Sequence, residues 1–475
     1  MAVTIQSLSS AAGMRVVNPA TGATIAHVAD MSDDEALATC SEAGRAFAAW
    51  AAVPAVERER ILLRAAELMR AQAEGLARII TAEQGKPLQE ARDEIAYGAN
   101  FVAWYAAEGR RTYGDTIPAT DPQKRLLVFP EPVGPVLLVA ASNDPHAMVT
   151  RKGAPALAAG CPIVIKPAPE TPLSALACAA LFREAGVPEG VVRVVTTSRP
   201  AAVTQAMLAH DDIRHLTFTG SSHVGKILGA QAGGLMKPMT MELGGHAPFV
   251  VYDDAEVELA AADLAARKFT NAGQTCSCPQ RIFLQDAIAS RFIEALAAKI
   301  DAIVVGDGAE PGVTMGPLLS APAVAKVERH VGDALARGAK LVRGGKRIDR
   351  GPGTFHAPTL LAEASDAMLL AQEETFGPVA AVWRFRDEAE LMPWLNHPSY
   401  GLTGYCYTRD IGRAFRTSKA MRVGFIGLND RRPQGPEVPL GGVRDSGLGR
   451  EGGRWGIEQF LTLKYLSLRL PALRQ

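Results

Sequence analysis

Between residues 136 and 234, short apolar runs alternate with helical patterns, and this alternation restricts the fold more than any other feature of the chain. The apolar runs are 136–141, 163–166, 191–195 and 213–218, and the helical patterns are 148–159, 173–185, 201–209 and 222–233. Such a rhythm is typical of a parallel sheet covered by helices on both faces. A second block begins near Phe249 and runs to Leu428. The sequence therefore predicts an α/β fold whose ligands bind beyond the carboxyl ends of the strands.

The segments outside this alternation are predicted to be helices and extended arms. Ser32, followed by three acidic residues, marks a helix start, and alanine-rich helical patterns continue to about Gly109. Four prolines interrupt residues 113–132. Because proline cannot donate a hydrogen bond to a strand ladder, this segment predicts an arm or hairpin and not a core strand. Residues 1–30 predict another extended arm, and the β-like run 460–470 predicts an edge strand for pairing with another subunit.

The composition limits the class of protein and its partners. The chain has 475 residues, enough for about two to four domains, and its 50 lysines and arginines balance its 50 acidic residues. A nucleic-acid groove or a surface for anionic membranes would need a basic excess, so neither partner is expected. The six cysteines are scattered, no signal peptide is visible, and the apolar runs are too short to span a bilayer. We expect a cytoplasmic globular protein.

Cys276 is the candidate nucleophile. It ends the sequence Asn-Ala-Gly-Gln-Thr-Cys at 271–276, between a helical pattern at 255–269 and a β-like run at 281–284. A cysteine on a flexible approach of small and polar residues is well placed to be an accessible thiolate, which is the reactive form. The alternative, equally open at this point, is that Cys276 is an ordinary small buried residue.

A glycine-containing turn at 220–226 predicts a phosphate site. Its Gly-x-x-x-x-Gly-Lys spacing is that of a nucleotide phosphate loop, but Ile227 follows where Ser or Thr would hold magnesium, so nucleotide hydrolysis is not expected. Free N–H groups at the start of a helix instead suit a dinucleotide pyrophosphate at Gly220 and Ser221. An ordinary strand-to-helix turn has the same pattern and remains the alternative.

Several polar residues stand where apolar runs end, which is where ligands bind in such a fold. Glu242 suits a general base, because an apolar setting would raise its pKa. The Asn143 amide could donate to an oxyanion, and Lys166 could reach a ribose or phosphate. Glu374 beside Phe376 suits ribose hydroxyls and a nicotinamide ring. Each pattern alone also fits an ordinary turn.

Seven motifs together resemble the aldehyde dehydrogenase superfamily. They are S-N-D-P at 142, G-C-P-I-V-I-K-P at 160, F-T-G-S at 218, M-E-L-G-G at 241, G-Q-T-C at 273, E-E-T-F-G-P-V at 373 and G-G-V-R-D-S-G-L-G-R-E-G at 441. Their order and spacing match from about residue 15 to 467. The resemblance implies an aldehyde dehydrogenase-like α/β fold. Its expected parts are a Rossmann-like cofactor domain (1–112 and 134–243), an α/β catalytic domain (244–443) and a small β oligomerisation element (113–133 and 456–475), in a homodimer or homotetramer.

The resemblance also implies NAD(P)-dependent oxidation of a small-molecule aldehyde to a carboxylic acid. Cys276 would attack the aldehyde to give a thiohemiacetal, whose oxyanion the Asn143 amide and the Cys276 backbone N–H would hold. Hydride transfer to the nicotinamide would leave a thioester, and Glu242 would activate the water that hydrolyses it. Members of the superfamily that release the acyl group to coenzyme A lack this glutamate, so release of the free acid is expected.

The cofactor residues implied by the resemblance are Lys166, Gly220, Ser221, Glu374 and Phe376. Many NAD-using members carry an acidic residue three positions after the lysine, where it bonds the adenosine ribose. That position is Pro169 here, with Glu170 one residue later. NAD is the expected cofactor, and NADP stays open because no carboxylate at position 169 repels its 2′-phosphate.

Within the superfamily, C-S-C at 276, V-T-R-K at 149 and S-G-L-G-R-E-G at 446 are similar to the succinate-semialdehyde dehydrogenase branch. There, the arginine matching Arg151 pairs with the distal carboxylate of the substrate, but the second arginine of that clamp is Thr270 here. The other residues expected at the substrate are Asp144, Arg431, Arg432, Gln434 and Cys278. These changes predict an aldehyde with a polar or anionic tail, and not succinic semialdehyde itself. Cys278 would form a reversible disulfide with Cys276 or be a bystander thiol.

Four other interpretations remain open. They are succinate-semialdehyde dehydrogenase proper, a coenzyme A-acylating enzyme, a cofactor-independent cysteine hydrolase and a non-catalytic protein that has kept the fold. Reduction of nicotinamide during turnover separates the hydrolase from the dehydrogenase. The presence of Cys276, Glu242 and Asn143 together disfavours a non-catalytic protein. No grouping of histidines and acids predicts a metal site.

Overall fold

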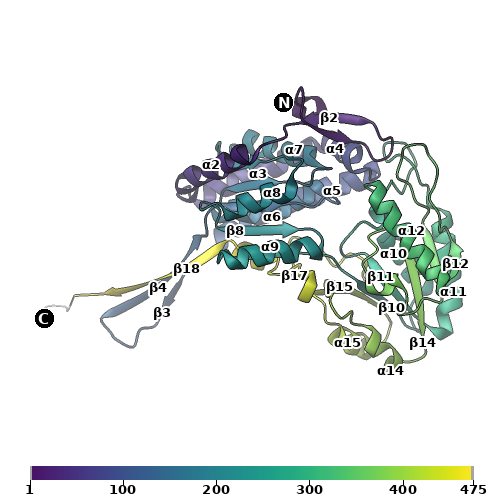
Figure 1. Cartoon of the computed structure of the whole chain (residues 1–475). Coiled ribbons are helices and arrows are strands. Elements are labelled where there is room, and N and C mark those ends of the chain that lie inside the picture. The colour runs from purple at the N-terminus through teal and green to yellow at the C-terminus, as the bar shows by residue number, and fades with distance from the viewer. Residues whose placement is uncertain (1–2, 472–475) are drawn as a thin grey trace.

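The computed structural model describes residues 3–471, in which two mainly parallel sheets and a projecting arm are the main parts (Figure 1). The first sheet has the strand order β17-β9-β8-β5-β6-β7. Its strands are β5 (Val136–Val139), β6 (Ile163–Lys166), β7 (Val192–Val194), β8 (His215–Thr219), β9 (Met239–Glu242) and β17 (Gly447–Leu448). All neighbours are parallel except β17, which runs antiparallel to β9.

Helices cover both faces of the first sheet, and the sequence of β5 explains why. Val136 and Leu138 pack into a core with α3 to α7, whereas Leu137 and Val139 pack with α2, α8 and α9. Successive side chains of a strand point to opposite faces, so a strand buried on both faces is apolar throughout. The helices are α2 (Asp33–Ala51), α3 (Ala55–Ala71), α4 (Ala73–Gln84), α5 (Leu88–Glu108), α6 (Pro145–Ala159), α7 (Pro172–Glu184), α8 (Pro200–Ala209) and α9 (Ser222–Gly234).

The second sheet has the strand order β12-β13-β14-β11-β10-β15-β16 and a separate core around Phe249, Phe283 and Trp383. Its strands are β10 (Ala247–Val251), β11 (Pro279–Gln285), β12 (Lys340–Arg343), β13 (Thr359–Ala362), β14 (Val379–Phe385), β15 (Thr403–Tyr407) and β16 (Phe425–Leu428). Only the edge pair β12–β13 is antiparallel. Its helices are α10 (Val257–Lys268), α11 (Asp286–Asp301), α12 (Ala321–Ala336), α13 (Leu369–Gln372), α14 (Glu388–Leu391) and α15 (Ile411–Ala420).

The arm is a three-stranded antiparallel sheet that projects from the body of the molecule (Figure 1). It is made of β3 (Asp115–Ile117), β4 (Lys124–Pro132) and β18 (Leu461–Arg469), and the short helix α16 (Gly453–Glu458) precedes β18. β18 pairs with β4 without interruption, from Leu461 opposite Pro132 to Arg469 opposite Lys124. The predicted arm and the predicted edge strand are thus one structure, with one edge of β18 left free.

The N-terminal segment is more regular than the extended arm that the sequence predicts. It holds the short helix α1 (Ile5–Leu8) and a hairpin of β1 (Met14–Val17) and β2 (Thr24–Val28). The helix start at Ser32 is confirmed, because its hydroxyl accepts from Glu35 N–H while the Glu35 carboxylate accepts from Ser32 N–H. Across residues 3–471, no helix is both long and apolar enough to cross a membrane. The predicted α/β fold class is confirmed.

Candidate active site

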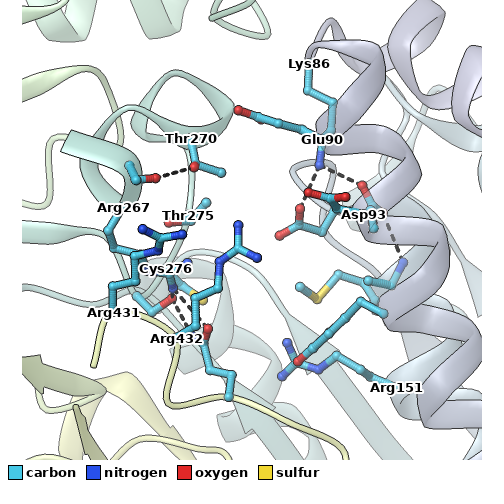
Figure 2. A pocket seen from close by; sticks show the side chains of 18 residues that line it. Lys86, Glu90, Asp93, Arg151, Arg267, Thr270, Thr275, Cys276, Arg431 and Arg432 are labelled. Atoms are coloured by element: carbon cyan, nitrogen blue, oxygen red, sulfur yellow. Dashed lines mark hydrogen bonds and ion pairs between the residues drawn. The ribbon is translucent and has the colours of Figure 1, made fainter. Parts of the chain in front are cut away.

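The cavity that holds Cys276 lies where α5 and α6 of the first sheet face α10 of the second sheet and two loops (Figure 2). Its volume is about 310 Å³, within the range of small-molecule sites. The other residues expected at the substrate that line it are Asp144, Arg151, Arg431, Arg432 and Gln434. Residues far apart in the sequence therefore share one cavity with the candidate nucleophile.

Cys276 is carried by a tight, buried loop. After α10, Asn271 and Ala272 adopt left-handed backbone angles, with φ 51° and 53°. The Asn271 side chain accepts from Gln84 Nε2 at 2.8 Å and donates to the carbonyl of Asn143 at 2.8 Å. The prediction that a flexible segment leads to Cys276 is therefore wrong. The small residues are present because the chain must turn sharply between packed neighbours.

Two further motifs pack against this loop. A Cβ at Gly245 would collide with the carbonyl oxygen of Cys276, so only glycine allows this close approach. Glu374 accepts from the Gly245 N–H at 2.9 Å, and burial raises the pKa of Glu374 to about 7. Phe376 follows with a left-handed φ of 52°. Glu374, one of the expected cofactor residues, is thus held beside the cysteine loop.

The thiols of Cys276 and Cys278 have different surroundings. Burial raises the pKa of the Cys276 thiol to about 12, with Arg151 acting in the opposite direction, so this thiol is protonated at neutral pH. Cys278 is fully buried, does not line the cavity, and lies with its sulfur 3.4 Å from Lys268 Nζ. The prediction that Cys278 contacts the substrate is therefore wrong. A turn closed by Cys278 N–H and the Thr275 carbonyl directs Cys278 into the interior.

Glu242 ends β9 with only 4% of its surface exposed. Burial raises the pKa of Glu242 to about 8, and the charge of Glu451 adds to this effect. Glu451 is itself paired with Arg151 and Lys152. Within residues 3–471, no group donates to Glu242 Oε1. The expected rise in pKa is confirmed, but its cause is burial beside charged groups, and not an apolar setting.

An ion-pair cluster fixes the residues that follow β5. Lys86 Nζ pairs with Glu94 at 2.6 Å and with Asp144 at 2.7 Å. The other Glu94 oxygen accepts from the first two N–H groups of α6, so Glu94 caps this helix and leaves Asp144 at the cavity. The Asn143 amide donates to Asp144 at 3.0 Å. No other partner of this side-chain amide is present among residues 3–471, and Asn143 is not among the residues that line the cavity of Cys276.

Charge is divided between two walls of the cavity (Figure 2). One wall, on α5 and the start of α6, presents four carboxylates and one lysine. The opposite wall presents Arg267, Arg431 and Arg432, and Arg151 of α6 lies below the acidic wall in this view. The cavity thus favours a substrate that is charged or strongly polar over an apolar one.

A second cavity, of about 720 Å³, lies at the carboxyl ends of β5, β6 and β8. Lys166, Gly220 and Ser221 line it, together with Pro169 and Glu170. Burial lowers the pKa of Lys166 to about 8, and the charge of Glu170 opposes this. A lysine, the start of α9 and an apolar wall suit the adenosine and pyrophosphate half of a dinucleotide.

Two parts of the site were missed by sequence reasoning. One is the acidic wall, although Glu90, Glu94 and Tyr97 recur at intervals of four and three residues, which places them on one face of α5. The other is Arg267, which stands three residues before Thr270, where an arginine was expected and absent. In residues 3–471, no three His, Cys, Asp or Glu side chains are grouped as a metal site.

Comparison with known proteins identifies the family. The sequence profile of the aldehyde dehydrogenase family matches residues 6–466. The 3-sulfolactaldehyde dehydrogenase of Pseudomonas putida is 47% identical over 97% of this chain and 95% of its own. The NADP(+) succinate-semialdehyde dehydrogenase of Escherichia coli K12 is 46% identical over 96% and 94%.

Solved structures agree with the sequence comparison. The crystal structure of succinate-semialdehyde dehydrogenase from Burkholderia pseudomallei superposes with a TM-score of 0.95 and 45% identity, covering 97% of this chain and 95% of that one. Fold, motifs and relatives therefore lead to one conclusion. This chain belongs to the aldehyde dehydrogenase family and is an NAD(P)-dependent oxidoreductase that acts on an aldehyde.

Proposed function

We propose that this enzyme oxidises an aldehyde with an anionic or polar tail and releases the free carboxylic acid. The observation that carries the proposal is the cavity in which Cys276 lies with four arginine side chains. By their names, the two relatives act on aldehydes that carry a sulfonate or a carboxylate, which supports an anionic tail. Succinate-semialdehyde dehydrogenase activity proper is compatible with the same relatives and is the second candidate.

In the proposed reaction, the Cys276 sulfur bonds to the aldehyde carbon, and the thiol proton passes to water. The Asn143 amide and the Cys276 backbone N–H hold the oxyanion that forms. A nicotinamide cofactor, when bound, would supply the acceptor for the hydride that leaves the same carbon. Glu242 removes a proton from the water that cleaves the resulting thioester, because its carboxylate is buried, close to Arg151 and free at Oε1.

We assign the cofactor to the domain of residues 1–112 and 134–243, and the catalytic cysteine to the domain of residues 244–443. Lys166, Gly220 and Ser221 would hold the adenosine and pyrophosphate, with Glu374 and Phe376 toward the cysteine loop. Because Glu170 lines the second cavity, its charge would repel a 2′-phosphate. NAD is therefore the proposed cofactor in preference to NADP.

Two further observations support a proposal for assembly and location. The arm has apolar side chains in water, with Leu463 74% and Tyr465 58% exposed. A three-stranded sheet with an open edge and no core of its own would be stabilised by a second copy, so we assign residues 113–133 and 456–471 to a homodimer or homotetramer contact. Residues 472–475 of the predicted oligomerisation element lie outside the described residues. All six cysteines are free, in accord with a reducing cytoplasmic compartment.

Reduction of nicotinamide tests the proposal directly. The purified protein would be given NAD or NADP with aliphatic, aromatic and carboxylated aldehydes, beside a Cys276→Ala variant. We expect reduction with a carboxylated aldehyde and none with the variant. Ester hydrolysis without any nicotinamide reduction on the whole panel would overturn the proposal in favour of a cysteine hydrolase. Succinic semialdehyde preferred strongly over all other aldehydes would instead select the second candidate.

A further inference from the structure

We infer that Arg267 is the residue that binds the anionic group of the substrate, from a position three residues before the arginine that Thr270 replaces. This inference rests on the proposed function and names the side chain that would recognise the anionic tail of the substrate. Arg267 belongs to the last turn of α10, and both Arg267 and Thr270 line the cavity with Cys276. Thr270 lies just beyond the end of α10, in the short turn at 270–273, but both side chains line the same cavity, so Arg267 stands near the position that the clamp arginine would occupy.

The other arginines of the cavity are less suited to this role. Arg151 donates to Glu451, a carboxylate that it shares with Lys152, through Nε at 2.9 Å and Nη2 at 2.5 Å, so one edge of its guanidinium is already occupied. Arg431 Nη1 pairs with Asp263 at 2.9 Å. Arg432 is exposed to solvent, which weakens any ion pair that it makes. Among the arginines of the cavity, Arg267 is therefore the one whose guanidinium is best placed to bind the anionic group of the substrate.

The bonding of Arg267 leaves it without a counter-charge. Its Nε donates to the Tyr405 hydroxyl at 3.0 Å, and its Nη2 donates to the Ser277 hydroxyl and to Gln434 Oε1. All three partners are neutral, and within residues 3–471 no carboxylate forms an ion pair with Arg267. Its Nη1, with two N–H groups, has no partner in the same part of the chain. An arginine fork held rigid on one edge and free on the other is prepared for a carboxylate or sulfonate.

The network also places Arg267 close to the reacting group. Ser277 follows Cys276 directly, and its carbonyl accepts from the Tyr405 hydroxyl at 2.8 Å. Gln434 Nε2 donates to the Ser277 hydroxyl at 2.8 Å, so a loop from the far end of the chain closes over the guanidinium. An anion on Arg267 would thus lie beside the nucleophile, which suits an aldehyde with a short tail.

The opposite wall directs an anion to the same place. Figure 2 shows Glu90 and Asp93 across the cavity from Arg267. Lys86 neutralises part of this wall through Glu94 and Asp144, but Glu90 and Asp93 form no ion pair among residues 3–471. A carboxylated tail would be repelled there and attracted at Arg267, so one orientation of the substrate is favoured.

Paired substrates test this inference in steady-state kinetics with succinic semialdehyde and butanal, which differ by one carboxylate. Arg267→Met should raise KM for succinic semialdehyde about 10- to 100-fold, the loss expected for one charge-assisted contact. It should change kcat/KM for butanal by less than about threefold, and Arg267→Lys should recover part of the loss. Arg291→Met, at an exposed arginine of α11, is the matched control. Equal losses on both substrates would show that Arg267 only supports the loop.

A binding assay separates this inference from the proposed function. Methanesulfonate or succinate should slow the alkylation of Cys276 by iodoacetamide in the unmodified enzyme, and Arg267→Met should abolish that protection. The assay needs no turnover. Protection that depends on Arg267, in an enzyme that oxidises no aldehyde, would retain the anion site and reject the proposed function. Protection that is unchanged in Arg267→Met would overturn the inference even if aldehydes are oxidised.

Discussion

Glu242 is a buried carboxyl whose free oxygen and raised pKa make its role testable by pH. With a pKa near 8, it is protonated and unable to accept a proton from water at lower pH, and it becomes a base as the pH rises through 8. We expect kcat to rise with pH and to level off above about pH 8. Glu242→Gln should lower kcat roughly 10²- to 10⁴-fold and remove this pH dependence.

The control for Glu242 is the alkylation of Cys276, which does not need a hydrolytic base. Glu242→Gln should leave the rate of iodoacetamide labelling near that of the unmodified enzyme. A variant that keeps the rising kcat–pH profile would show that another group activates the water.

Glu170 is the residue that we expect to set the choice between NAD and NADP. It lines the same cavity as Lys166, and its carboxylate would face the 2′-phosphate of NADP. Glu170→Gln should raise kcat/KM for NADP about tenfold, roughly 1.4 kcal/mol, with little change for NAD. Initial rates with each cofactor measure this. An equal change in kcat/KM for NAD and NADP in Glu170→Gln would mean that Glu170 does not contact the ribose.

At the level of single residues, the sequence motifs predicted some of the candidate site, and the rest became visible only in the structure. The motifs brought Cys276 to the cavity and led to the raised pKa of Glu242. They did not lead to Arg267 or to the inward turn of Cys278, because both depend on where a side chain points after a loop has closed. Such directions are set by contacts such as that between Arg267 and Gln434, from positions far apart in the sequence.

Among the elements, the loop that carries Cys276 makes the sharpest prediction. Asn271 tolerates its left-handed backbone better than most residues and joins Gln84 to the carbonyl of Asn143. Asn271→Ala should lower the free energy of unfolding by about 1–3 kcal/mol and reduce kcat more than it reduces cofactor binding. Chemical denaturation and steady-state kinetics measure the two effects. The adjacent control is Ala272→Gly, which suits the left-handed φ and should keep activity.

A kcat for Asn271→Ala equal to that of the unmodified enzyme would show that the turn, and not its hydrogen bonds, positions the thiol.

The regular strands and helices were easier to predict from the sequence than this loop. The strands and helices of residues 136–234 lie within three residues of their predicted limits, because both apolar period and turn residues mark them. The break between α3 and α4 at Gln72 has no glycine or proline and was not predicted.

For the whole molecule, the projecting arm predicts self-association. Leu463, 74% exposed on β18, would be covered by a second copy, so Leu463→Glu should reduce the molar mass measured by analytical ultracentrifugation. Val56→Glu replaces another exposed apolar residue, on α3, and should leave the mass unchanged. An unmodified protein that sediments as a monomer at all concentrations would contradict the assignment of the arm.

The overall architecture was predictable from the alternation of strands and helices and from the motifs. The pairing of β17 with β9 was not. The two-block alternation indicates two α/β sheets, whereas β17 is a pair of residues in a glycine-rich stretch with no strand signal of its own. Its pairing with β9 comes from tertiary packing, since Gly447 fits against the Met241 carbonyl where a side chain would not. The local sequence contains no pattern that would predict this contact.

The position of β17 also has a consequence for how the protein is made. Because translation runs from the N-terminus, every strand of the second sheet leaves the ribosome after β9 and before β17. Until residue 447 emerges, β9 is an open strand edge, and its last residue is Glu242. The proposed general base, Glu242, therefore stands on the part of the first sheet that is covered last. A translation product that stops short of residue 447 would expose that edge to pairing with other chains.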